Sequence, residues 1–135
     1  MPNENLKKRL LSHVFFLIFL LFFLNSAAMY FSWYWTLPWF DIPMHFLGGF
    51  WAFLFLNYLY LFTPLGKIAS PAIFLVSGLI FIGLAWEIFE FVFDRIGELG
   101  VITIRDSIKD LIFDFLGGGA AYFYLKYIGL WQTRQ

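Results

Sequence analysis

Residues 41–62 read DIPMHFLGGFWAFLFLNYLYLF, and this stretch decides the fold. From Met44 to Phe62 the chain is almost wholly apolar, over close to the roughly 20 helical residues that cross a hydrocarbon core. The stretch has no two-residue alternation, and strands facing lipid would need a closed barrel. It therefore predicts a membrane-spanning helix over residues 44–62.

Three further stretches have the same character: residues 10–31, 71–93 and 107–129. The chain is 61% hydrophobic and 13% charged, whereas soluble domains carry about 25% charged residues. The net charge of zero gives no reason to expect a nucleic-acid partner, and the absence of cysteine excludes thiolate metal sites. Residues 1–135 are therefore predicted to form one all-α domain in the lipid bilayer, a bundle of about four transmembrane helices.

Basic residues predict the orientation of this bundle. With four crossings, one set of them falls on the side of both chain ends, and a smaller set, accompanied by acidic residues, falls on the other side. Both termini are therefore predicted to be cytoplasmic. The larger set is Lys7, Lys8, Arg9, Lys67, Lys126 and Arg134, and the smaller set is Arg95, Arg105 and Lys109.

The first apolar stretch has a second interpretation. Lys7–Arg9, the apolar run and then Ser26-Ala27-Ala28 are also typical of a signal peptide with its cleavage site. An uncleaved helix is favoured because the apolar and aromatic run continues through residues 29–31. Cleavage would leave three helices and keep the polar residues described below on the outer side.

The first polar cluster opens residues 41–62. Asp41 and His45 are four residues apart, a spacing that places both on one helix face. Asp41 has an alternative role as a helix cap, since an Asp shortly before Pro43 suits that position. His45 lies among apolar neighbours, so it is a candidate metal ligand or catalytic group.

The second cluster lies late in residues 71–93. Glu87 and Glu90 are three residues apart on one face, and Gly83 lies one turn before Glu87. Two carboxylates so close in a low dielectric need a shared proton, a basic partner or a metal ion. Both are candidate metal ligands, and Glu87 is also a candidate catalytic residue. Gly83 would leave room for a neighbouring helix or a ligand.

The third cluster opens residues 107–129. Asp106, Asp110 and Asp114 recur every four positions and share a face. Asp106 has an ordinary explanation as a helix cap, although it too is a site candidate. Lys109 and Asp110 could form an exposed pair, whereas Asp114 lies two turns into an apolar run. Asp110 and Asp114 are candidate catalytic residues and metal ligands.

The predicted topology places all three clusters in the outer leaflet. Asp41-x-x-x-His45-Phe-Leu-Gly-Gly also parallels Asp110-x-x-x-Asp114-Phe-Leu-Gly-Gly, at a constant offset of 69 positions. Both segments have the same predicted direction, which suggests a parallel repeat of two-helix units. Their glycines would let two backbones approach closely, with His45 and Asp114 in equivalent, facing positions.

These motifs resemble those of the VanZ-like membrane proteins and the related YjdF-type family. The matching elements lie within residues 38–125, although Asp114 stands where an Asn often follows the Asp in VanZ-like proteins. VanZ-like proteins are associated with teicoplanin resistance, so the resemblance implies a bacterial envelope membrane protein and supplies no reaction. The elements are Asp41/His45, Trp86-Glu87-x-Phe89-Glu90, and Asp106/Asp110/Asp114 with Gly117–Gly119.

Three functions remain open on the sequence. Carboxylates with one His suit a divalent metal ion that acts on a lipid or envelope-precursor head group, with Arg95 and Arg105 holding an anionic group. Alternatively, the cluster binds or transports a cation or protons without catalysis, for which a homo-oligomer would be needed. The third interpretation is a buried polar network that fixes helix register.

Overall fold

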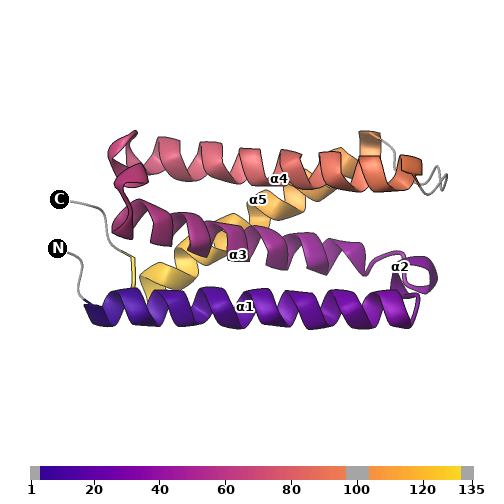
Figure 1. Cartoon of the computed structure of the whole chain (residues 1–135), viewed down its shortest axis with the longest axis horizontal. Coiled ribbons are helices and arrows are strands. Elements are labelled where there is room, and N and C mark those ends of the chain that lie inside the picture. Colours follow the sequence, from indigo (N-terminus) through magenta and orange to yellow (C-terminus); the bar gives the residue numbers. More distant parts are fainter. Residues whose placement is uncertain (1–3, 97–103, 132–135) are drawn as a thin grey trace.

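A computed structural model describes residues 4–96 and 104–131, with side chains described in all of these except 93–96. Within these ranges the protein is all-α, as predicted, and its four long helices fall on the four predicted stretches (Figure 1). A short helix, α2, and a 3₁₀ turn, η1, lie in the first two connections. The elements are α1 (Glu4–Tyr30), α2 (Trp33–Thr36), α3 (Asp41–Phe62), η1 (Pro64–Lys67), α4 (Pro71–Ile96) and α5 (Ile104–Tyr127).

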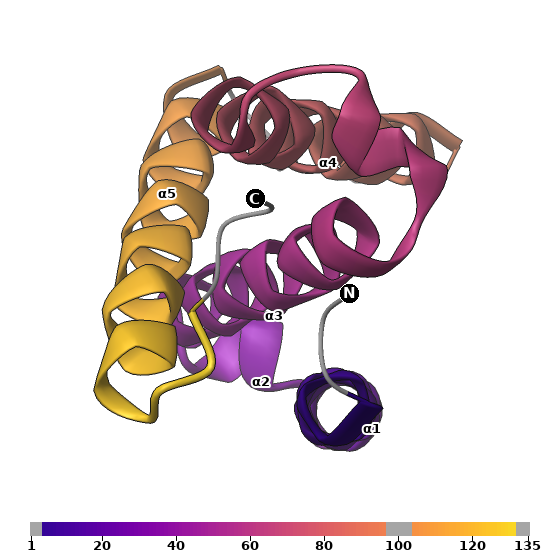
Figure 2. The ribbon, with the colours of Figure 1, turned by 90° about the vertical axis from the view of Figure 1, so that its left-hand side faces the viewer.

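Helix α3 is the centre of the bundle. It packs most extensively against α5 and also contacts α1 and α4 (Figure 2). Helices α3 and α5 run in the same direction and cross, and α5 ends at the end of the molecule where α1 begins (Figure 1). The described members of the larger basic set, at the start of α1, in η1 and at the end of α5, therefore lie at one end of the bundle, as predicted. Arg134 lies outside the described residues.

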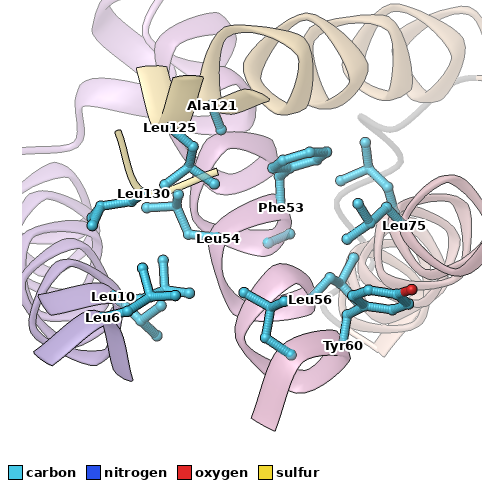
Figure 3. Packing of buried hydrophobic residues seen from close by; sticks show 14 residues of the cluster. Leu6, Leu10, Phe53, Leu54, Leu56, Tyr60, Leu75, Ala121, Leu125 and Leu130 are labelled. Carbon is cyan, nitrogen blue, oxygen red and sulfur yellow. The ribbon is translucent and has the colours of Figure 1, made fainter. Parts of the chain in front are cut away.

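The apolar core lies in the half of the bundle away from α2. Leu54 of α3 is fully buried and lies among Leu10 of α1, Leu125 of α5 and Leu130 (Figure 3). Phe53 of α3 points toward α5, and its ring contacts the rings of Tyr122 and Trp131. Side chains on several faces of α3 are thus buried, which explains why its sequence is apolar all round rather than striped.

The outer surface of the bundle suits lipid. Large rings of α1 such as Phe16, Phe22 and Phe23 are exposed, as is Phe81 of α4. Among the described residues, three helices are long and apolar enough to cross a membrane: α1, α3 and residues 71–92 of α4. The fourth predicted span, α5, forms as a long helix but carries more charge, and two of its aspartates, Asp110 and Asp114, are buried within the bundle.

The start of α3 differs from the sequence prediction in two ways. Pro43 was expected in the connection, yet it lies in the first turn of α3, where a missing N–H costs no helical hydrogen bond. The interpretation of Asp41 as a helix cap is also wrong, because Phe40 holds the cap position and Asp41 is the first helical residue. Asp106 likewise lies inside the first turn of α5.

Glycines set the distance between α3 and α5. A Cβ atom on Gly49 would overlap the backbone of Asp114, and one on Gly117 would overlap the carbonyl oxygen of Phe46. Each helix thus has one glycine against the backbone of the other. The two contacts are not equivalent under the 69-residue offset, which relates Gly49 to Gly118 and Gly48 to Gly117. Close backbone approach through small residues is the usual means of helix association in a membrane. It is also what brings His45 and Asp114 face to face.

A polar side chain that was not among the predicted site residues lies in the core. Asn57 of α3 is fully buried, and neither its amide nitrogen nor its oxygen has a hydrogen-bond partner. An unpaired buried polar group costs about 1–3 kcal/mol. We expect Asn57→Leu, which has a similar volume, to raise the free energy of unfolding by about 1–2 kcal/mol in denaturant titrations of the detergent-solubilised protein. A lower free energy of unfolding would show that the Asn57 amide contributes to stability.

Candidate functional site

His45 lies at the centre of a cluster of carboxylates formed by α3, α4 and α5. Its side chain is almost completely buried. On one side of the ring, Nδ1 lies 3.4 Å from Asp114 Oδ1. On the other side, Nε2 lies 3.5 Å from Asp41 Oδ1 and 4.0 Å from both Glu90 Oε2 and Asp110 Oδ2. The imidazole therefore connects all three helices.

Helical spacing explains how each helix presents its side chains. Asp41 and His45 are one turn apart on α3, and Asp110 and Asp114 are one turn apart on α5. The crossing of the two helices then places the α5 pair opposite the α3 pair. The predicted facing of His45 and Asp114 is confirmed by the contact at Nδ1.

Helix α4 contributes two carboxylates in different states. Glu90 is half-buried, and Trp86 Nε1 donates a hydrogen bond of 2.8 Å to its Oε1. Glu87 is 7% exposed, and neither of its carboxylate oxygens has a hydrogen-bond partner. Even so, ligand atoms of His45, Glu87 and Glu90 lie within 4.8 Å of one another. Glu87 is thus a buried carboxylate close to the imidazole, and both of its oxygens are free to bind a ligand.

Lys109 partly balances the charge on the α5 side. Its Nζ lies 3.3 Å from Asp110 Oδ1, 3.6 Å from Asp41 Oδ2 and 3.8 Å from Asp106 Oδ1. Lys109 was predicted as an exposed partner of Asp110 alone, whereas it also links α5 to α3. Asp106 is half-exposed at the rim and belongs to neither group of metal-ligating atoms described here.

Gly83 lets α5 approach α4 at the level of this cluster. A Cβ atom on Gly83 would come within 2.8 Å of Leu111 Cδ2 and 3.2 Å of Asp114 Oδ2. The predicted role of Gly83, room for a close neighbour, is therefore met by α5. A side chain here would have to push Leu111 aside and would crowd Asp114, which contacts His45.

The short helix α2 closes the cluster on the side of α1. Tyr34 donates a hydrogen bond of 2.8 Å from its hydroxyl to Asn25 Oδ1 of α1. Burial, together with the negative charges of Asp41 and Glu90, raises the pKa of Tyr34 to about 12. The phenol thus stays neutral and remains a donor across the physiological range. Tyr34 was not among the predicted site residues, so its polar role was missed.

The structure does not bring every predicted residue into the cluster. Arg105 is exposed on the first turn of α5, and among the described residues Lys109, not Arg105, pairs with the carboxylates around His45. Arg95 was also predicted to hold an anionic group, but its side chain lies outside the described residues. The predicted site residues that the structure does bring together are Asp41, His45, Glu87, Glu90, Asp110 and Asp114.

The cluster has the arrangement of ligands that metal-binding histidines use. Such a histidine donates one ring N–H to a carboxylate, which fixes the ring while the other nitrogen binds the ion. Here Asp114 faces Nδ1, and Nε2 faces the oxygens of Asp41, Glu90 and Asp110. Two groups of residues, Asp41/His45/Asp110 and His45/Glu87/Glu90, have ligand atoms close enough to hold one ion.

Comparison with known proteins places the chain in a family of membrane proteins. Residues 4–129 match a family described as "Predicted membrane protein (DUF2238)". No curated protein and no solved structure matches the chain. The family match supports a membrane protein and does not itself extend to VanZ-like or YjdF-type proteins. With nearly its whole length matched and three helices apolar enough to cross a bilayer, the chain belongs to this DUF2238 family of predicted membrane proteins.

Proposed function

We propose that this membrane protein binds one divalent metal ion inside the bundle, with His45, Glu87 and Glu90 as its central ligands. The observation that carries the proposal is Glu87, a carboxylate with no partner for either oxygen, close to the imidazole. A buried charge without a partner is costly, and an ion bound here would supply one. Carboxylate oxygens with one imidazole suit Mg²⁺, Mn²⁺ or Zn²⁺.

The charge of the cluster also supports a bound cation. Five carboxylates surround His45: Asp41, Glu87, Glu90, Asp110 and Asp114. Lys109 is the only Lys or Arg side chain paired with any of them among the described residues. Like charges at this spacing repel strongly in a low dielectric, and a divalent ion would relieve that repulsion.

We also propose that the site faces the outer leaflet and serves a lipid or envelope substrate. The basic residues Lys7, Lys67 and Lys126 lie at the start of α1, in η1 and at the end of α5, all at the end of the bundle away from the cluster (Figure 1). The positive-inside rule assigns that end to the cytoplasm. The resemblance to VanZ-like proteins supports an envelope role, with Asp110 and Asp114 as acid–base or positioning groups.

Metal binding is tested with purified protein stripped by a chelator and then titrated with Mn²⁺. We expect one ion per chain by elemental analysis and by the loss of free Mn²⁺ signal in electron paramagnetic resonance. Glu87→Gln should weaken binding at least tenfold because it removes a ligand. Asp114→Asn should weaken it by about 10- to 100-fold, the usual effect of changing the group that orients a metal-binding histidine. Wild-type protein without stoichiometric metal would overturn the proposal.

Asp106→Asn is the matched control, because it removes the same charge at the rim of the cluster. We expect its affinity for Mn²⁺ to be within about threefold of the wild type, since surface charges have small effects.

A second measurement distinguishes metal binding from a polar network that only fixes helix register. Glu87→Gln should leave the thermal stability of the metal-free protein unchanged or raise it, whereas a structural role for Glu87 would require a clear loss.

A further inference from the structure

A cavity leads from the lipid-facing side of the bundle to the carboxylate cluster. It has a volume of about 340 Å³, which lies at the lower end of the range for ligand pockets, about 300–1,000 Å³. Helices α1 and α4 form its walls and α3 its floor. Most of its lining is apolar: Ile18, Leu21 and Phe22 of α1, Met44, Trp51 and Ala52 of α3, and Leu79, Ile82 and Trp86 of α4.

Both walls have large exposed rings, which places the cavity beside the bilayer. Phe22 of α1 and Trp86 of α4 line the cavity and are also substantially exposed on the surface of the bundle. Both helices are apolar enough to span a membrane. A cavity between them is therefore accessible to molecules dissolved in lipid, without a path through water.

One end of the cavity is polar and negatively charged. Three carboxylates line it, Asp41, Glu90 and Asp114, together with His45 and Tyr34. The cavity lining contains no Lys or Arg side chain within the described part of the chain. Lys109 pairs with Asp41 and Asp110 and does not line the cavity. A head group that reaches this end thus meets a net negative surface.

From this arrangement we propose that the cavity binds an amphiphile with one alkyl chain and a cationic ammonium head group. The chain lies between α1 and α4, and the ammonium reaches Glu90, Asp41 and Asp114. Three N–H donors of a primary ammonium match three acceptor carboxylates. The inference goes beyond the metal site and does not depend on it: the two share Glu90 and His45, but Glu87 does not line the cavity.

The head group, rather than the chain, should determine selectivity. An alkyl chain gains little binding free energy when it moves from lipid into an apolar cavity, because lipid tails are as apolar as the side chains that line the cavity. Charge-assisted hydrogen bonds in a low dielectric are stronger than neutral ones. Amphiphiles of one chain length should therefore bind in the order ammonium, alcohol, carboxylate.

The test uses the full chain in a non-ionic detergent, with a chelator present so that no divalent ion competes. The probes are dodecylammonium, dodecanol and dodecanoate. Binding is followed by the rise in melting temperature and by quenching of tryptophan fluorescence with chain-brominated analogues, since Trp51 and Trp86 line the cavity. We expect the ammonium to bind at least about tenfold more tightly than the alcohol, and the carboxylate to bind most weakly.

Gly48 offers a way to fill the cavity without disturbing the backbone. It lines the cavity, and a Cβ atom there would have only one neighbour within 4 Å, Asp114 Oδ1 at 4.0 Å. Gly48→Leu should reduce ammonium binding at least about tenfold, and Glu90→Gln should do so by removing one acceptor. Gly119→Leu on α5 is the matched control, because a Cβ atom there would meet nothing within 4 Å.

Two results would overturn the proposal. One is equal binding of the alcohol or the carboxylate, which would show that the carboxylates do not select the head group. The other is ammonium binding and bromine quenching unchanged in both Gly48→Leu and Glu90→Gln, which would place the chain and head group elsewhere. Either result would leave the Mn²⁺ titration unaffected, so failure of this proposal is separable from failure of the metal site.

Discussion

Replacing Gly49 with alanine is expected to lower the free energy of unfolding by about 3 kcal/mol. This is the upper end of the range of about 1–3 kcal/mol that is usual for overpacking a core. The added Cβ atom would overlap the backbone of Asp114. Backbone cannot rotate away as a flexible side chain can, so α3 and α5 must separate. Separation of these two helices would also pull Asp114 away from His45.

Gly119→Ala is the control for this prediction, because it adds the same methyl group to α5 where nothing lies within 4 Å. We expect it to be neutral or slightly stabilising, since alanine favours a helix more than glycine does. Both variants are measured by unfolding in mixed micelles with increasing denaturing detergent. Equal stability of Gly49→Ala and Gly119→Ala would mean that α3 and α5 do not pack as closely as described.

His45→Leu should have the second large effect, a loss of about 3–5 kcal/mol in the free energy of unfolding, which is typical of removing one partner from a buried ion pair. Its nitrogens lie within 4.0 Å of carboxylates from three helices. Leucine fills similar space but leaves those carboxylates without the imidazole. The same unfolding assay measures the loss, in chelator so that metal binding does not contribute.

The other histidine gives a matched control. Within the described part of the chain, the hydrogen bond of His13 of α1 is to the carbonyl oxygen of Arg9, at 2.6 Å, in its own helix. His13→Leu should cost no more than about 1.5 kcal/mol, the upper value for an ordinary hydrogen bond. A double variant, His45→Leu with Asp114→Leu, should recover part of the loss, since it removes the buried charge together with its partner. A His45→Leu cost no larger than that of His13→Leu would show that the carboxylates do not depend on the imidazole.

The helices could be predicted because their signals are local. The length and apolar character of residues 10–31, 44–62 and 71–93 require only the thickness of a bilayer, and the structure forms helices over these stretches. The spacing of Asp110 and Asp114 likewise fixes one helix face whatever surrounds it. Helix starts were less predictable: Pro43 was expected outside the helix and lies in its first turn.

The partners across helices could not be predicted in the same way. Lys109 was expected to pair with its neighbour Asp110, and its additional contact with Asp41 depends on the crossing of α3 and α5. Tyr34 was missed because aromatic residues near a membrane surface are common. For Asn57 a signal was present, an amide within an apolar helix, but its lack of partners depends on tertiary packing.

The composition of α5 has a consequence for biosynthesis. Helices α1 and α3 and residues 71–92 of α4 are long and apolar enough to enter lipid on their own, whereas each aspartate at the centre of an inserting helix costs about 2.5–3.5 kcal/mol. The counter-charges for Asp110 and Asp114 include His45 of α3, which is synthesised earlier in the chain. We therefore expect α5 to enter the bilayer only alongside α3, so that the integration of α5 also assembles the site.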